Sequence, residues 1–131
     1  MTDEPLVLLI EDDKPCSNLL KFMLSRSGYR VLVAEDGLSA KNKINILSQP
    51  PHLVLLDLMM PFVDGYQLLQ QIRRKPEWVN TPVIILSTKT EEKNIVRAFD
   101  LGAFDYVTKP FQLGELLARI RCQINNRLHH G

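Results

Sequence analysis

The chain has 131 residues, of which 45% are hydrophobic and 24% are charged, and its formal net charge is +1. This length predicts a single domain over residues 1–131, with a core large enough to fold without disulfides or structural metals. The near-neutral charge balance gives no indication of direct nucleic-acid binding. The acidic N-terminus and the short apolar run that ends at Ile10 fit neither a signal peptide nor a membrane span, so we expect a cytoplasmic protein without membrane contact.

Short apolar runs alternate with amphipathic helical patterns along the whole chain. The first run turns abruptly into the acidic residues Glu11, Asp12 and Asp13, and Pro15 marks the first turn of the helix that follows. Gly28 supplies the left-handed stop of that helix. The expected strands are 6–10, 29–34, 53–56, 83–86 and 104–107, and the expected helices begin at Pro15, at Gly37, after Gly65, at Glu91 and at Leu113, the last one running to about Arg127.

Three side chains and one helix are assigned from their neighbours in the sequence. Cys16 and Cys122 lie far apart at apolar positions of helical patterns, so we expect two small buried side chains and no disulfide. Trp78 lies in the polar stretch 75–82, which predicts a surface loop and a partly exposed ring. The helix from 91 to 102 has the weakest apolar stripe, which predicts the least anchored helix of the domain.

Five strands alternating with five helices predict an α/β fold with a parallel sheet that is covered on both faces. In such a sheet every strand ends at the same edge, where open α/β sheets bind their ligands. A cluster of polar residues is expected there, because they follow four different strands: Glu11 and Asp12 after the first, Asp57 after the third, Ser87 after the fourth and Lys109 after the fifth.

Asp57 is the central residue of this cluster, because a bare carboxylate follows the buried run Leu53–Leu56. An isolated aspartate at such a position more often caps a loop or helix. Ser87 alone is equally compatible with a turn residue, and Lys109 alone with a solvated surface lysine. Three converging carboxylates would repel one another, so one of them takes up a proton unless a cation is present. All-oxygen ligands suit Mg²⁺ or Mn²⁺, and carboxylates can attack phosphorus to give acyl phosphates. The predicted chemistry is metal-assisted phosphoryl transfer to Asp57, with Ser87 and Lys109 stabilising the phosphoryl oxygens.

The sequence closely resembles the receiver domain of two-component response regulators over nearly its whole length. The resemblance is carried by Leu-Ile-Glu-Asp-Asp ending at Asp13, by Leu-Leu-Asp-Leu-Met-Met-Pro around Asp57 with Asp-Gly at 64–65, by Ile-Leu-Ser ending at Ser87, and by Gly-Ala-Phe-Asp-Tyr-Val-Thr-Lys-Pro-Phe over 102–111. It implies a flavodoxin-like sheet of order 2-1-3-4-5 flanked by five helices.

The resemblance also implies a role for each site residue. Asp57 is the expected phosphoacceptor, and the acidic residues after the first strand are the expected metal ligands: Asp12 directly and Glu11 through water, with Met59 contributing its backbone carbonyl. The other implied roles are a hydroxyl and an aromatic that move together on activation at Ser87 and Tyr106, a phosphoryl-binding ammonium at Lys109, and a cis peptide bond between Lys109 and Pro110.

Some positions depart from the family pattern. Ser87 stands where threonine is commonest, and Thr88 stands where a small residue is usual, which narrows access to the phosphoryl site. Met59 and Lys89 occupy positions that tune the lifetime of the phosphoryl group, so that lifetime does not carry over from other members. The chain is interpreted either as a stand-alone regulator or as the receiver of a longer one.

The partners implied by the resemblance are a histidine kinase or phosphotransfer protein, a downstream effector, and a second copy of the chain in a weak dimer. The dimer would use the surface formed by the fourth helix, the fifth strand and the fifth helix. Its expected intermolecular pairs are Asp100 with Arg121 and Asp105 with Arg119. Arg97 lies on the same surface, and Ile95 stands where a basic partner for Glu115 is expected, so the network is incomplete.

Three alternative functions agree with part of the sequence. An FMN-binding flavodoxin shares the topology, but Glu11, Asp12 and Asp13 would repel the FMN phosphate. A phosphatase of the haloacid dehalogenase class also uses a strand-end aspartate, but it needs a second acid where this chain has Met59. A binding module that is never phosphorylated is the third, and the combination of Asp57, Ser87 and Lys109 argues against it.

Overall fold

The structure is a computed structural model and describes residues 4–130. Strands and helices alternate as the sequence predicts, with one additional pair of very short strands and a single 3₁₀ turn. The elements are β1 (Leu6–Ile10), α1 (Lys14–Arg26), β2 (Arg30–Ala34), α2 (Gly37–Ile46), β3 (Leu53–Asp57), β4 (Met59–Met60), β5 (Val63–Asp64), α3 (Gly65–Arg74), η1 (Pro76–Trp78), β6 (Val83–Ser87), α4 (Glu92–Asp100), β7 (Asp105–Thr108) and α5 (Leu113–His130).

The main sheet has five strands in the order β2-β1-β3-β6-β7, and all neighbouring strands run parallel. When the short strands β4 and β5 are set aside, this is the predicted order 2-1-3-4-5, so the flavodoxin-like fold class is confirmed. The two short strands form a separate antiparallel hairpin, in which Met59 pairs with Asp64 and Met60 with Val63. This hairpin was not predicted from the sequence.

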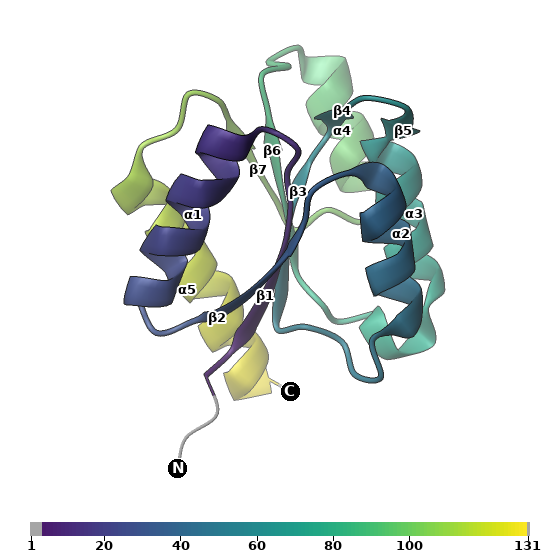
Figure 1. The fold of residues 1–131 in the computed structure, drawn as a ribbon. Helices are drawn as coiled ribbons and strands as arrows, with labels where there is room; N and C mark the ends of the chain where they lie inside the picture. The colour runs from purple at the N-terminus through teal and green to yellow at the C-terminus, as the bar shows by residue number, and fades with distance from the viewer. Residues whose placement is uncertain (1–3, 131) are drawn as a thin grey trace.

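Helices cover both faces of the sheet (Figure 1): α1 and α5 lie on one face, and α2, α3 and α4 lie on the other. Alternate residues of β1 and β3 point to opposite faces, as the period of two in a strand requires. Leu8, Ile10, Val54 and Leu56 enter the core beneath α2, α3 and α4. Their neighbours in sequence join the core beneath α1 and α5. The central strands are therefore buried on both faces, which explains why they read as continuous apolar runs.

The first helix begins and ends as its sequence predicts. The Asp13 side chain caps α1 by accepting a hydrogen bond from the Cys16 backbone N–H at 3.0 Å, and a proline occupies the first turn. After α1, Gly28 has a φ of +93°, the left-handed conformation that most other residues adopt only at a cost. This stop turns the chain back into β2.

Trp78 lies fully buried, so its predicted partial exposure is wrong. The 3₁₀ turn η1 directs the indole ring inward, and the Lys75 ammonium lies 5.8 Å from its centroid. The half-buried Arg73 side chain holds this turn in place, because its Nη1 donates to the backbone carbonyls of Trp78 at 3.2 Å and Val79 at 2.8 Å. A polar loop thus covers one large apolar ring, which composition alone does not reveal.

Three apolar positions on α1 and α5 are less buried than their residue types suggest. Cys122 is exposed and Cys16 is only partly buried, although both were expected to be buried. The apolar Leu19 of α1 is 46% exposed. The inward face of α5 is set by the four-residue steps of Leu116, Ile120 and Ile124, and Cys122 lies off that line. Neither cysteine forms a disulfide.

Most element boundaries differ from the prediction by one residue, and those of the fifth strand and the last helix are two examples. The fifth strand of the main sheet begins at Asp105, and Phe104 lies outside it. Helix α5 extends to His130, past its expected end near Arg127. Within residues 4–130, no helix combines the length and the apolar content that a membrane span requires.

Candidate functional site: an acidic pocket at the strand ends

The carboxyl ends of β1 and β3 bring three acidic side chains together. Strand β1 pairs with β3 in a register that places Ile10 beside Leu56, so the residues that follow are neighbours. One carboxylate oxygen from each of Glu11, Asp12 and Asp57 lies within 4.8 Å of the other two. Glu11 is 1% exposed and Asp57 4% exposed, whereas Asp12 is partly open to solvent. The predicted convergence of these residues at one sheet edge is present.

Lys109 supplies the positive charge of this pocket. Its Nζ lies 2.7 Å from Glu11 Oε1 and 3.5 Å from Asp57 Oδ2. The backbone contributes to this position, because the Lys109 N–H donates to the Ser87 carbonyl at 2.8 Å and so aligns the residue beside β6. The Lys109–Pro110 peptide bond is cis, as the resemblance implied.

The two buried carboxylates differ in proton affinity. Burial, followed by the hydrogen bond with Glu11, raises the pKa of Asp57 to about 7. Burial would also raise the pKa of Glu11, but its hydrogen bonds with Asp57 and Lys109 outweigh that effect and lower it. Burial acts to lower the pKa of Lys109. The hydrogen bond that Lys109 donates to Glu11 and the negative charge of Asp57 both act in the other direction, and the pKa of Lys109 is raised overall. A single ammonium therefore does not neutralise the whole pocket, and in the absence of a metal the excess negative charge is relieved by protonation.

The donor set suits a small hard cation. The site offers three carboxylates, which are the ligands that Mg²⁺ and Mn²⁺ prefer. The partial exposure of Asp12 leaves one side of the group open to water, and Mg²⁺ characteristically keeps several water ligands. The residues present therefore fit the expected metal.

The β4–β5 hairpin borders the pocket and orients Asp57. The Met59 N–H donates to Asp57 Oδ1 at 2.9 Å, so the backbone of β4 fixes the carboxylate. Gly65 lets the hairpin close tightly, because a Cβ atom there would lie 2.6 Å from the Cα atom of Leu58. Met59 was expected to act through its backbone carbonyl. Its N–H contact with Asp57 was not expected.

Ser87 and Tyr106, the predicted switch pair, are connected through Lys89. Ser87 ends β6 and is fully buried, and its Oγ accepts a hydrogen bond from the Lys89 N–H at 3.0 Å. The Tyr106 hydroxyl donates to the Lys89 carbonyl at 2.8 Å. The segment between β6 and α4 is therefore held from both sides by the two side chains.

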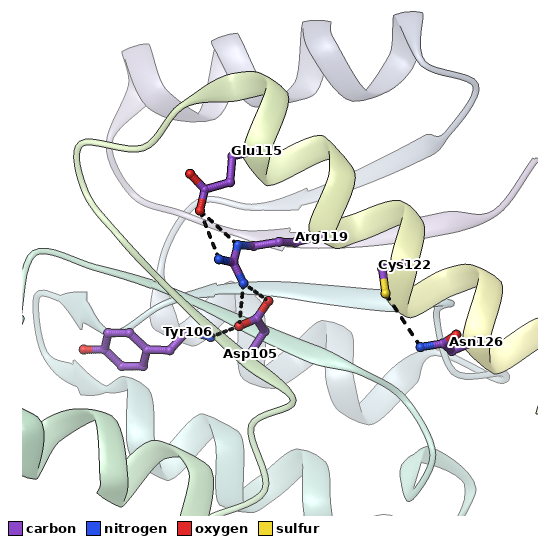
Figure 2. Close-up of polar contacts among 6 residues, drawn as sticks. All are labelled: Asp105, Tyr106, Glu115, Arg119, Cys122 and Asn126. Carbon is purple, nitrogen blue, oxygen red and sulfur yellow. Dashed lines mark hydrogen bonds and ion pairs between the residues drawn. The ribbon is translucent and has the colours of Figure 1, made fainter.

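The predicted interaction surface of α4, β7 and α5 carries an ion-pair cluster within one chain (Figure 2). Arg119 Nη1 lies 3.0 Å from Asp105 Oδ2, and its Nη2 lies 3.0 Å from Glu115 Oε1. The ring of Tyr106 points away from this cluster. The expected pair of Asp105 with Arg119 thus exists inside the monomer. Asp100 and Arg121 are exposed on α4 and α5.

Arg97, the remaining residue of that surface, contacts α3. Its guanidinium lies 4.0 Å from the centroid of the Tyr66 ring. The Tyr66 hydroxyl in turn donates to the backbone carbonyl of Asn94 at 3.2 Å. Tyr66 was not predicted as a functional residue, although its place directly after Gly65, among the buried residues of α3, was a usable signal.

Comparison with known proteins agrees with this geometry. The family model of the response regulator receiver domain matches residues 7–121. The chain therefore belongs to the receiver-domain family of response regulators, which act in two-component signalling. This assignment selects the receiver family over the flavodoxin and haloacid dehalogenase alternatives.

Individual relatives are similar over most of the chain. The DNA-binding dual master transcriptional regulator RpaA of Synechocystis sp. is 39% identical over 117 residues, which are 89% of this chain and 48% of that protein. The chain thus spans about half the length of this curated relative. The receiver domain of the Francisella response regulator 1452 is 35% identical with a TM-score of 0.85, and the match covers 94% of this chain and 98% of that one. A CheY-like receiver domain protein from Methanospirillum hungatei has a TM-score of 0.90 at 23% identity, covering 98% and 100% of the two chains, which shows the shared fold.

Proposed function

We propose that Asp57 accepts a phosphoryl group, from the phosphohistidine of a histidine kinase or phosphotransfer protein or from a small acyl phosphate, in a reaction that requires Mg²⁺ or Mn²⁺. The observation that carries this proposal is the convergence of the Glu11, Asp12 and Asp57 carboxylates within 4.8 Å, with the Lys109 ammonium beside them. The chain is then a phosphoacceptor that catalyses only its own phosphorylation and dephosphorylation. This role places it in the cytoplasm with its donor.

In the transfer step, an oxygen of the Asp57 carboxylate attacks phosphorus. A new O–P bond forms while the P–N bond to the donor histidine breaks, and the departing imidazole nitrogen keeps the electron pair and takes up a proton. Glu11 and Asp12 would hold the metal, which when bound neutralises charge on the phosphoryl oxygens. Lys109 offers a charge-assisted hydrogen bond to one of those oxygens, and the Met59 N–H keeps Asp57 oriented.

The phosphorylated state is read out, in this proposal, through Ser87 and Tyr106. Both contact Lys89, which lies three residues before the start of α4. Within the described residues, Ala98 is the buried residue of α4, so a shift of this helix breaks few apolar contacts. The surface of α4, β7 and α5 would then present an altered face to a downstream effector or to a second copy of the chain.

Intact-mass measurement with acetyl phosphate tests the proposal. We expect a single added phosphoryl group in the presence of Mg²⁺, and no addition with EDTA or in the Asp57→Asn variant. Asp64→Asn is the matched control, because Asp64 caps α3 and is not part of the pocket. Labelling that persists in Asp57→Asn would show that a different residue is the acceptor.

A further inference from the structure

The tip of the β4–β5 hairpin has an unfavourable backbone conformation at Phe62. This residue has a φ of +68°, the one positive φ found for a non-glycine residue in the described part of the chain. The Val63 N–H donates to the Pro61 carbonyl at 2.8 Å, two residues back. These are the features of a γ-turn with positive φ, which is the rare and strained form. A bulky residue in this conformation is an outlier, and glycine or asparagine would adopt it more easily.

Packing within the chain does not compensate for this strain. The Phe62 side chain is 106% exposed, the highest value among the exposed large hydrophobic residues of the described region. An exposed apolar residue on its own is ordinary. An exposed aromatic ring on a strained backbone is unusual, because both features are unfavourable for the isolated monomer. A gain outside the monomer is the simplest physical reason for phenylalanine at this position.

The hairpin that carries Phe62 borders the acidic pocket. Met59, on the adjacent strand of the hairpin, is 51% exposed and binds Asp57 through its N–H. On the other side of the turn, Val63 packs against Gly37 at the start of α2. Leu38, the next residue of α2, is 68% exposed. We call Met59, Phe62 and Leu38 the apolar rim, and Figure 1 shows the hairpin above α2 and α3 at the edge where β3 ends.

We propose that Phe62 inserts into an apolar pocket of the protein that phosphorylates Asp57, and that it contributes to the choice of that donor. This inference rests on the proposed function. Asp57 is only 4% exposed, so a protein that brings its phosphohistidine to this carboxylate must cover the rim around it, including the hairpin. A small acyl phosphate reaches Asp57 without covering the rim. Buried aromatic residues frequently dominate the energy of protein interfaces.

The Phe62→Asn variant separates docking from chemistry. Asparagine tolerates positive φ, so we expect the melting temperature to rise by about 3 °C. Labelling by acetyl phosphate should proceed at the wild-type rate. The protein donor is chosen from a panel of purified, autophosphorylated histidine kinases as the one that labels the wild-type chain fastest. Phosphoryl transfer from this kinase to Phe62→Asn should be at least about fivefold slower, because the KM for the kinase rises. Phe62→Tyr, which keeps an aromatic ring, should retain most of that transfer rate.

Ile46→Asn is the matched control, because Ile46 is 76% exposed at the far end of α2. It should leave transfer from the kinase unchanged. A wild-type transfer rate in Phe62→Asn overturns the proposal, as does equal loss of labelling with both donors. A lower melting temperature shows that the strain is absent and also overturns it. If Phe62→Asn instead weakens only self-association, the occupant of the rim is a second copy of the chain. Failure of wild type to be labelled by either donor rejects the proposed function, which is a separate outcome.

Discussion

Asp12 and Asp13 are adjacent acidic residues with different environments. Asp12 points an oxygen into the carboxylate group with Glu11 and Asp57, whereas Asp13 accepts the Cys16 N–H at the start of α1. A capping aspartate stabilises a helix both by this hydrogen bond and by its charge near the positive end of the helix dipole. The two residues therefore serve metal binding and helix stability separately.

We predict that the two alanine substitutions affect different properties. Asp13→Ala should lower the free energy of unfolding by about 1 kcal/mol and change Mg²⁺ affinity little. Asp12→Ala should weaken Mg²⁺ binding strongly and leave the unfolding free energy nearly unchanged without metal. Urea unfolding and calorimetric Mg²⁺ titration measure the two quantities. Equal losses of Mg²⁺ affinity in the two variants would assign Asp13 to the metal site as well.

At the residue scale, proximity at the sheet edge could be predicted, whereas burial of particular side chains could not. Strand ends in a parallel sheet are neighbours by topology, so Glu11, Asp57 and Lys109 were expected together. The burial of Trp78 depends on Arg73 binding the carbonyls of a polar loop. Such a contact has no periodic signature in sequence.

At the element scale, α4 is held by polar and aromatic contacts in place of an apolar face. Tyr66 of α3 is 6% exposed and donates its hydroxyl proton to the Asn94 carbonyl in the first turn of α4. Burial raises the pKa of Tyr66, so the hydroxyl keeps the proton that it donates. Tyr106 holds Lys89 just before the same helix. The start of α4 therefore has one tyrosine contact from α3 and another from β7.

Removing the first of these contacts should loosen α4 without unfolding the domain. We predict that Tyr66→Phe lowers the unfolding free energy by roughly 1 kcal/mol, the usual worth of one hydrogen bond. Hydrogen exchange should accelerate in α4 and stay unchanged in α1 and α5. Tyr29→Phe is the control, because Tyr29 lies between α1 and β2. Unchanged exchange in α4 would mean that the hydroxyl does not restrain the helix.

The order of helices and strands was predictable because each carries a clear pattern, and the weak anchoring of α4 was visible in its poor stripe. The β4–β5 hairpin was missed because its strands have two residues each, too few to show alternation. In the sequence, Pro61 and Gly65 indicate only that regular structure is interrupted there. In the fold, Pro61 lies within the hairpin and Gly65 directly after it, and Met59 of the hairpin contacts Asp57 through its N–H.

At the scale of the whole molecule, the charged surface of α4, β7 and α5 bears on self-association of the chain. Arg119 already binds Asp105 and Glu115 inside the monomer. An intermolecular pair would exchange one exposed ion pair for another, and such pairs contribute at most about 1 kcal/mol each. The surface charges alone therefore support only weak dimerisation.

We predict a weak dimer that tightens with beryllofluoride and Mg²⁺ and dissociates as salt screens the charges. Sedimentation velocity measures this, and Arg119→Ala should remove the beryllofluoride effect. Arg74→Ala is the matched control, since Arg74 is exposed at the end of α3. A chain that sediments as a monomer in every state would leave this face to a different partner.

The buried Trp78 gives the protein an intrinsic optical probe with a specific range. It is the only tryptophan of the chain, and it precedes β6 at the edge of the sheet opposite Asp57, about 15 Å away along the strands. Its fluorescence should be blue-shifted in the native state and shift red on unfolding. Phosphorylation should leave the emission nearly unchanged, because the fully buried ring lies at the end of the strands opposite Asp57. Denaturation curves followed by this fluorescence therefore report unfolding of the whole domain, and the same signal can be used with or without phosphorylation.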